Sequence, residues 1–325
     1  MNKFIKTLAA AGLALGLLQA AAVRADDFPS RPLRYINPNP PGSGSDVVGR
    51  TFASALAKQL NQAVYVENRG GAGSTIGSEL GAKAAADGYT LTQTSSPLFS
   101  VVPLVYPKLA FDPVKDFRSI IMLAGFQNVL VVHPSVPVKS VSELIAYARA
   151  HPGKLTYAST GNGTTTHLSG EMFRQMTGAD ITHVPYKGGA PATNDLLGGQ
   201  VNMMFANVPA VIQHIKAGSL RALAATGATR EPGLPEVPTM AEAGVANYEA
   251  AGWFSVSVPA ATPQPVVDKL SKAAMAAVKQ PEFMRVMEQN GFSVMGGTPQ
   301  QMDQMAQAEI RRWGPVVKAT NLRLD

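Results

Sequence analysis

Apolar and polar positions follow two periods along the chain, and the two periods alternate. Short β-rich runs are each followed by a loop of small residues and then by apolar positions at helical spacing. The predicted strands and apolar runs lie at residues 33–36, 64–66, 89–94, 119–123, 129–132, 155–159, 181–184, 201–205, 222–225 and 253–258. The predicted helices lie at residues 47–60, 74–85, 140–150, 167–176, 191–197, 209–217, 263–279 and 299–318. This alternation predicts an α/β fold with mostly parallel sheets.

Two β-rich runs that end at proline, residues 128–134 and 253–259, are typical of strands that carry a chain from one lobe to another. If both do so, residues 26–128 plus 253–325 form the first lobe and residues 129–252 form the second. Open α/β sheets bind ligands at loops beyond the carboxyl ends of their strands. We therefore expect a ligand cleft between two α/β lobes.

The first 25 residues form a secretory signal peptide pattern. Lys3 and Lys6 precede an apolar run at residues 8–18, and the sequence Val23-Arg24-Ala25 suits a cleavage site. A membrane anchor is the alternative, but the run is shorter than the roughly 20 apolar residues that span a bilayer. We expect residues 1–25 to be removed and the mature, periplasmic chain to begin at Asp26.

Charge and cysteine content exclude several classes of function. The 325 residues include 28 basic and 22 acidic ones, a formal charge of +6, and three of the basic residues lie in the predicted signal peptide. The remaining excess is too small and too scattered to argue for nucleic-acid binding. The chain has no cysteine, which excludes disulfides, thiol nucleophiles and thiolate metal sites.

No catalytic or metal-binding motif is present. The sequence contains no G-x-S-x-G, P-loop, H-E-x-x-H or G-x-G-x-x-G pattern, so we expect no catalytic residues, no cofactor and no metal. His167 and Glu171 share the spacing of a helical metal pair, but a histidine near a helix start with an acidic neighbour is the more ordinary interpretation. Because triads assemble from distant segments, the missing motifs argue only weakly against an enzyme.

Three neutral loops of small residues stand before predicted helices, at residues 37–46, 94–97 and 160–166. Glycine lets a backbone approach a ligand closely, and the first amides of a helix are unpaired and partly positive. Such loops can bind a carboxylate without an arginine, and two facing loops can hold a dicarboxylate at both ends. The alternative is ordinary turn and capping chemistry, with Asp46 as a helix cap.

Several longer motifs carry a family resemblance that runs from residue 28 to residue 325. They are PPGSGSDVVGR from residue 40, VENRGGAG from 66, ADGYTL from 86, YASTGNG from 157, HVPYKGGAP from 183 and DLLGGQV from 195. The chain resembles the periplasmic solute receptors of tripartite tricarboxylate transporters, often called Bug receptors. The resemblance implies a two-lobed, type II-like Venus-flytrap protein that binds a carboxylate and delivers it to a membrane permease. We expect a monomer.

The resemblance also supplies the candidate ligand-binding residues, which lie in two loops and at two strand ends. In the first lobe they are Asn39, Gly42, Ser43, Gly44, Ser45, Asp46, Ser95 and Ser96. In the second lobe they are Thr160, Gly161, Asn162, Gly163, Thr164, Thr165 and Asn207. In such receptors, backbone amides and bridging waters hold the ligand carboxylates.

Two departures from the family pattern concern the ligand. The family usually has an aromatic residue where this chain has Asn39, and its members often have an acid where this chain has Ala206. Loss of the acid removes a partner for a ligand ammonium group. We therefore expect a dicarboxylate or an aromatic carboxylate without an amine, such as terephthalate or another phthalate isomer.

Two other functions remain open from the sequence. One is a sensory binding protein that presents the same ligand to a signalling partner. The other is a periplasmic hydrolase with Ser43 or Ser96 as nucleophile and His167 as base.

Overall fold

The computed structural model describes residues 28–320 and residue 323, so the predicted signal peptide lies outside the described residues. The first lobe is built on three parallel strands, β1 (Leu33–Asn37), β2 (Val64–Asn68) and β3 (Thr90–Ser95). They are connected through α2 (Gly44–Leu60), η2 (Ala72–Ser74) and α3 (Thr75–Ala82). Helix α2 begins after Ser43, whose side chain accepts from the Asp46 amide, and ends where Asn61 adopts a left-handed conformation.

The second lobe repeats this plan. Its parallel strands are β5 (Leu155–Ser159), β6 (Ile181–Pro185) and β7 (Met203–Asn207). Its helices are α6 (Val141–Ala150), α7 (Thr165–Thr177), α8 (Gly189–Leu197) and α9 (Val208–Lys216), and β8 (Arg221–Ala225) follows.

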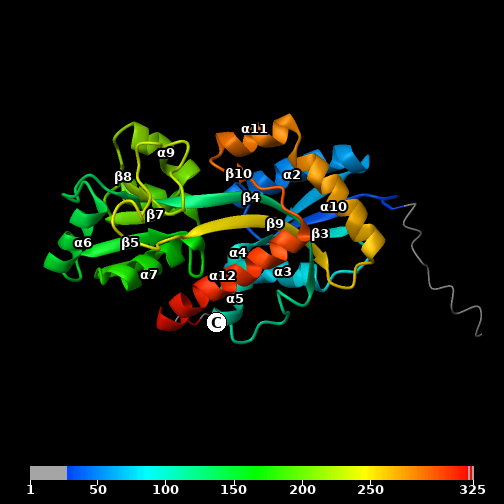
Figure 1. Ribbon diagram of the computed structural model, residues 1–325, viewed down its shortest axis with the longest axis horizontal. Helices are drawn as coiled ribbons and strands as arrows, with labels where there is room; N and C mark the ends of the chain where they lie inside the picture. The colour runs from blue at the N-terminus through cyan, green and yellow to red at the C-terminus, as the bar shows by residue number, and fades with distance from the viewer. Residues whose placement is uncertain (1–27, 321–322, 324–325) are drawn as a thin grey trace, which may run out of the picture.

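Two long strands, β4 (Phe117–Val132) and β9 (Ala251–Pro259), occupy the middle of the molecule (Figure 1). β4 pairs with β9 as far as Gln127 and with β7 from Asn128 onward, so one strand serves both lobes. These pairings are antiparallel, and the sheet order is β2-β1-β3-β9-β4-β7-β5-β6. The expectation of mostly parallel sheets, and of two separate runs at residues 119–123 and 129–132, was therefore wrong. β4 carries the chain from the first lobe to the second and β9 carries it back, so the two strands pair in opposite directions.

The C-terminal segment packs along both lobes. It comprises α10 (Gln264–Val278), α11 (Pro281–Gln289), β10 (Ser293–Val294) and α12 (Pro299–Thr320), and α12 contacts the short helices α4 (Ser96–Ser100) and α5 (Val102–Val105). Met302 packs with Leu98 and Phe99, whereas Trp313 lies in the same core cluster as residues of α7. α12 thus contacts the cores of both lobes, and the residue boundaries of the lobes stay a prediction.

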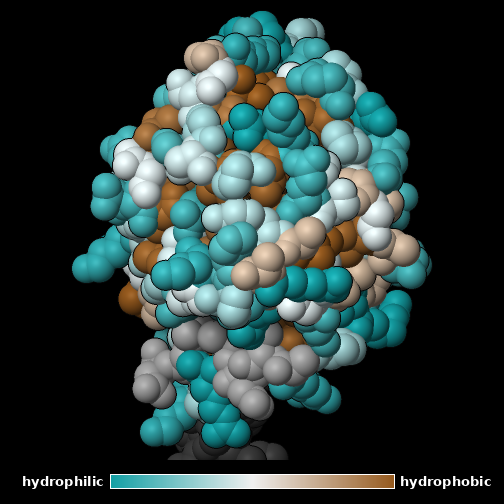
Figure 2. Space-filling view, turned by 90° about the vertical axis from the view of Figure 1, so that its left-hand side faces the viewer, coloured by the Kyte–Doolittle hydropathy of each residue, from teal (hydrophilic) through white to brown (hydrophobic). Residues whose placement is uncertain are grey.

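Among the described helices, none is long and apolar enough to cross a bilayer. Figure 2 looks onto the end of the second lobe. Hydrophilic residues cover most of that face, and hydrophobic ones are visible mainly between them.

Candidate functional site

Four strands end at the junction of the two lobes. β1 and β3 run in the same direction as the first part of β4, toward the junction, and β5 and β7 run toward it from the other side. Ser95 at the end of β3 lies opposite Phe254, which lies opposite Ala124. Asn207 at the end of β7 lies opposite Asn128. The N-termini of α4 and α9, which follow β3 and β7, therefore lie within a stretch of five residues along β4. The N-termini of α2 and α7 follow β1 and β5, which run toward the same junction.

The first-lobe loop is held by Asp46. Its carboxylate accepts hydrogen bonds from the Gly42 amide at 2.9 Å, from Asn68 Nδ2 at 2.8 Å and from Arg50 Nε at 3.0 Å. Burial alone would raise the pKa of Asp46, but these bonds outweigh it and lower the pKa. Gly42 has φ +76°, which a residue with a side chain rarely adopts. The Asp46 carboxylate therefore bonds to groups of its own loop and its own lobe.

Ser45 and Asn39 are engaged in the same way. The Ser45 hydroxyl donates to Asn37 Oδ1 at 2.9 Å and accepts from Gln93 Nε2 at 2.7 Å and from Asn39 Nδ2 at 3.0 Å. Ser43 is the cap of α2, and its hydroxyl also donates to the Pro40 carbonyl. In this loop the polar side chains organise the backbone, and Gly44, which is exposed, begins the helix. The first amides of α2 are the groups left for a ligand.

The β3–α4 turn separates its two candidate serines. Ser95 is partly exposed and ends β3 at the junction. Ser96 is only 1% exposed, and its hydroxyl accepts from the Trp253 amide at 3.3 Å. Of these two serines, only Ser95 is accessible from the junction.

The second-lobe loop is shaped by glycine conformation and threonine hydroxyls. Gly161 and Gly163 have φ +132° and +75°. Thr164 caps α7, accepting from the His167 amide at 3.4 Å and donating to the Gly161 carbonyl at 2.7 Å. Thr160 donates its amide to Thr166 Oγ1 at 2.9 Å. Asn162 is exposed, and Thr165 opens the helix.

A stacked pair of histidines supports this loop from beneath. The rings of His167 and His183 lie 4.0 Å apart at 17°. His167 Nδ1 accepts from the Gly163 amide at 3.1 Å, and His183 Nε2 lies 2.7 Å from Ser159 Oγ. Burial lowers the pKa of each to about 4, with Arg174 adding to the effect on His167 and His167 itself adding to that on His183. Both are neutral at pH 7, and His183 is a supporting residue that sequence reasoning missed.

The other acid and base candidates are also engaged. Glu171, four residues after His167, accepts from Tyr157 at 2.7 Å and from Arg174 at 2.6 Å. The lone pair of His167 that could act as a base is directed at the Gly163 amide. The Ser43 hydroxyl is bonded within its own loop and the Ser96 hydroxyl to the Trp253 amide of β9, so the geometry gives no support to the hydrolase alternative. Among the residues described, no three His, Cys, Asp or Glu side chains are grouped to hold a metal ion.

Asn207 is the last candidate residue of the second lobe, and it lies at the end of β7. Its Nδ2 donates to Asn128 Oδ1 at 2.8 Å, and Asn128 Nδ2 donates to Ser169 Oγ on α7 at 3.1 Å. Ala206 is fully buried. Asn207 is partly exposed at the end of β7, at the junction.

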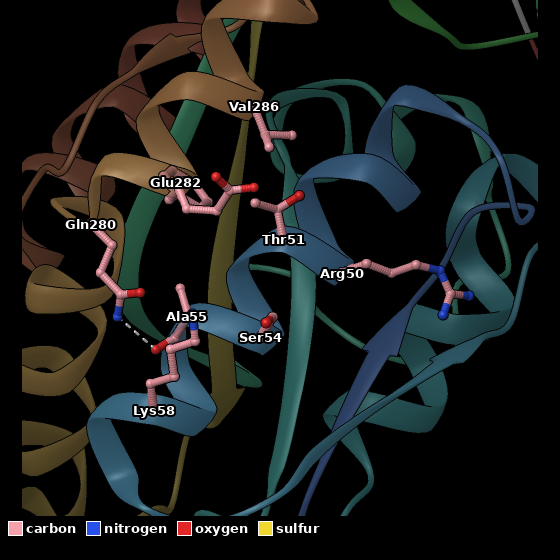
Figure 3. A pocket seen from close by; sticks show the side chains of 9 residues that line it. Arg50, Thr51, Ser54, Ala55, Lys58, Gln280, Glu282 and Val286 are labelled. Carbon is pink, nitrogen blue, oxygen red and sulfur yellow. Dashed lines mark hydrogen bonds between the residues drawn. The ribbon is translucent and has the colours of Figure 1, made fainter.

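One surface hollow lies away from the junction. A cavity of about 260 Å³ is lined by residues of α2 and by Gln280, Glu282 and Val286 of the α11 region (Figure 3). Gln280 donates to the Ala55 carbonyl, and Glu282 is paired with Arg285. This hollow lies along the side of α2, away from the strand ends, and contains none of the candidate ligand-binding residues.

Comparison with known proteins agrees with this architecture. Residues 48–322 match the tripartite tricarboxylate transporter family receptor. Protein BugT of Bordetella pertussis is 39% identical over 306 residues, covering 94% of each chain. Two Rhodopseudomonas palustris structures are similar throughout. Rpa4515 with adipate has a TM-score of 0.83 and 39% identity, covering 90% of this chain and 98% of that one. MatC with bound malate has a TM-score of 0.81 and 31% identity, covering 89% of this chain and 100% of that one.

The family match covers most of both lobes and includes the second-lobe loop, and it begins two residues after Asp46. The two-lobed binding-protein fold predicted from the sequence is confirmed by these structural neighbours. The chain belongs to the receptor family of the tripartite tricarboxylate transporters, a family of periplasmic solute-binding receptors rather than enzymes.

Proposed function

We propose that this receptor binds a small dicarboxylate between its lobes and delivers it to the permease of a tripartite tricarboxylate transporter. The observation that carries the proposal is that two helix starts preceded by glycine-containing loops, those of α2 and α7, follow strands that run toward the junction from opposite lobes. Each presents partly positive, unpaired amides that suit one carboxylate. Some of the candidate residues named from the sequence supply these amides. Others, such as Asp46 and Ser45, hold the loop backbone in place through their side chains.

The ligand we propose has no amine. Ala206 and Asn207 leave the end of β7 without a carboxylate, and Asn207 is bonded to the neutral Asn128. The Asp46 carboxylate is occupied by three donors of its own lobe. An ammonium group would therefore lose its water without gaining a charged partner. The similar structures with adipate and with malate, both dicarboxylates, agree with this choice.

The proposal further includes export and delivery. We propose that residues 1–25 direct the chain to the periplasm and that the closed, ligand-bound form docks on the permease. Closure requires that the ligand contact both lobes differently in the open and closed states.

The test is a binding measurement with a panel of carboxylates. Purified protein is titrated calorimetrically with succinate, glutarate, adipate, citrate, aspartate and glutamate, and each ligand is recovered for mass analysis. We expect a diacid to bind and to be recovered unchanged, and we expect aspartate and glutamate to bind more weakly than succinate and glutarate. Tighter binding of the amino acids would contradict the amine-free ligand, and chemical conversion would contradict a receptor. Uptake of the bound diacid by cells lacking the receptor gene should fall, which tests delivery.

A further inference from the structure

Three phenylalanines gather at the junction between the two candidate loops. Phe126 of β4 and Phe254 of β9 stack with ring centroids 4.7 Å apart at 28°. Phe292, just before β10, stands edge-on to them at 6.3 Å from Phe126 and 6.2 Å from Phe254. Phe126 and Phe254 are partly exposed, whereas Phe292 is only 9% exposed. The first two rings are therefore the apolar surface that this cluster presents to solvent.

Strand register places these rings on the same side as the candidate polar groups. Ser95 lies directly opposite Phe254, so their side chains share a face of the sheet. Gln93, two residues before Ser95, shares that face and donates to Ser45 at the start of α2. The α2 end and the rings therefore meet on one side of the central strands.

The same register leads to the second lobe. Phe126 and Asn128 are two residues apart on β4 and point to one face, and Asn128 bonds to Ser169 of α7. A Cβ placed on Gly252 would lie 2.5 Å from Phe126 Cζ and 3.1 Å from Thr165 Cγ2. The start of α7 therefore lies beside Phe126.

The first lobe reaches the cluster from the other side. A Cβ placed on Gly44 would lie 3.0 Å from Phe292 Cζ, so the first residue of α2 borders the third ring. The glycine at position 44 thus lets the ring approach the helix start closely. The order across the junction is α2 start, rings, α7 start.

We infer that Phe126 and Phe254 form the floor on which the body of the ligand rests, and that they select a dicarboxylate whose carboxylates are joined by an apolar body without hydroxyl groups. Partly exposed rings gain by covering apolar carbon, and a hydroxyl placed against them loses its water without gaining a partner. An extended six-carbon chain and a benzene ring both satisfy this condition. The inference rests on the proposed function and names the ligand class and the residues that select it.

The test compares two diacids of equal length. Adipate and galactarate have the same six-carbon chain, but galactarate carries hydroxyl groups on its inner carbons. We expect adipate to bind to the wild-type protein at least about tenfold more tightly than galactarate, and terephthalate to bind as well. Phe126→Ser should reduce the adipate-to-galactarate ratio about tenfold, because the serine hydroxyl can pair with a ligand hydroxyl.

The control is Tyr65→Ser, which removes an exposed aromatic ring (53% exposed) from β2, and it should leave the ratio unchanged. Galactarate binding as tightly as adipate to the wild-type protein overturns the inference and leaves the proposed function intact. An adipate-to-galactarate ratio that is unchanged in Phe126→Ser also overturns the inference and leaves the proposed function intact. Failure of every carboxylate in the panel to bind removes the proposed function, and the inference with it.

Discussion

At the residue scale, His167 links the candidate second-lobe loop to the buried interior of that lobe. Its folded pKa of about 4 lies below the ordinary value of 6.5, so between these pH values the unfolded chain binds more protons than the folded one. The free energy of unfolding therefore rises with pH through that window and is lost on acidification below pH 6.5, by about 3 kcal/mol at most for this group. Above pH 6.5 the contribution is constant.

His167→Asn tests this linkage, because Asn Oδ1 can still accept from the Gly163 amide but does not titrate. We expect denaturant unfolding of the variant to be less acid-sensitive than that of the wild type between pH 6.5 and pH 4. The control is His151→Asn at the exposed end of α6, where the histidine stacks on Tyr147 but is itself exposed. Parallel stability curves for wild type and His167→Asn would contradict the buried neutral state.

Asp46 is a second residue whose effect is exerted through the loop. Asp46→Ala removes the acceptor of the Gly42 amide and one of the two acceptors of Asn68 Nδ2, which should cost about 1–3 kcal/mol of stability and weaken the diacid about tenfold. Isothermal titration of the variant measures the affinity. Asp112→Ala is the matched control, since Asp112 likewise accepts from the Val114 and Lys115 amides but lies in another loop. An equal loss of affinity in both variants would show a general loss of stability instead.

At the element scale, the cap of α7 has a counterpart far from the junction. Thr164 caps α7 and Ser140 caps α6, and each accepts from the amide three residues on. Thr164→Val and Ser140→Ala should each lower stability by about 1 kcal/mol. Only Thr164→Val should also weaken the diacid, because Thr164 additionally holds the Gly161 carbonyl. Measuring both variants by denaturant unfolding and by titration separates the two effects, and unaltered affinity in Thr164→Val would contradict a role for this loop.

Local patterns predicted most elements of the lobes because they depend on neighbouring residues. The helix predicted at residues 140–150 forms with Ser140 as its cap, and the strand at residues 155–159 has the predicted bounds. The short helices α4, α5 and α11 were missed. α4 and α5 each begin at a proline-containing turn, and α11 buries only Phe283 and Met287. Such helices are stabilised by tertiary packing, which a sequence window does not contain.

The candidate site was predictable as backbone but not as side chains. Glycine, serine and threonine before a helix indicate exposed amides wherever they occur, so both candidate loops could be named from the sequence. Which side chains turn inward depends on partners far along the chain, such as Gln93 for Ser45 and Asn68 for Asp46. The ring cluster joins residues 126, 254 and 292, and no local pattern relates them.

At the scale of the whole molecule, the lobes share more than the strands that connect them. One core cluster contains Val101 and Val105 of the first lobe, Leu168 of α7, and Trp313 of α12. Trp313 is 2% exposed and donates to Glu309 at 2.7 Å. A movement of one lobe toward the other would have to bend β4, β9 and α12 together, which limits it to a small motion about the junction.

This shared core predicts that the two lobes unfold together. We expect a single calorimetric transition for the wild-type protein, because separating the lobes exposes the Trp313 cluster. Trp313→Ala should lower the free energy of unfolding by about 3–5 kcal/mol and divide the transition in two, with the diacid raising both midpoints and drawing them together. Leu270→Ala, a buried change in α10 within the first-lobe core, should destabilise without dividing the transition. Two transitions in the wild type would mean that α12 does not couple the lobes, and closure would then be free to hinge on the two strands alone.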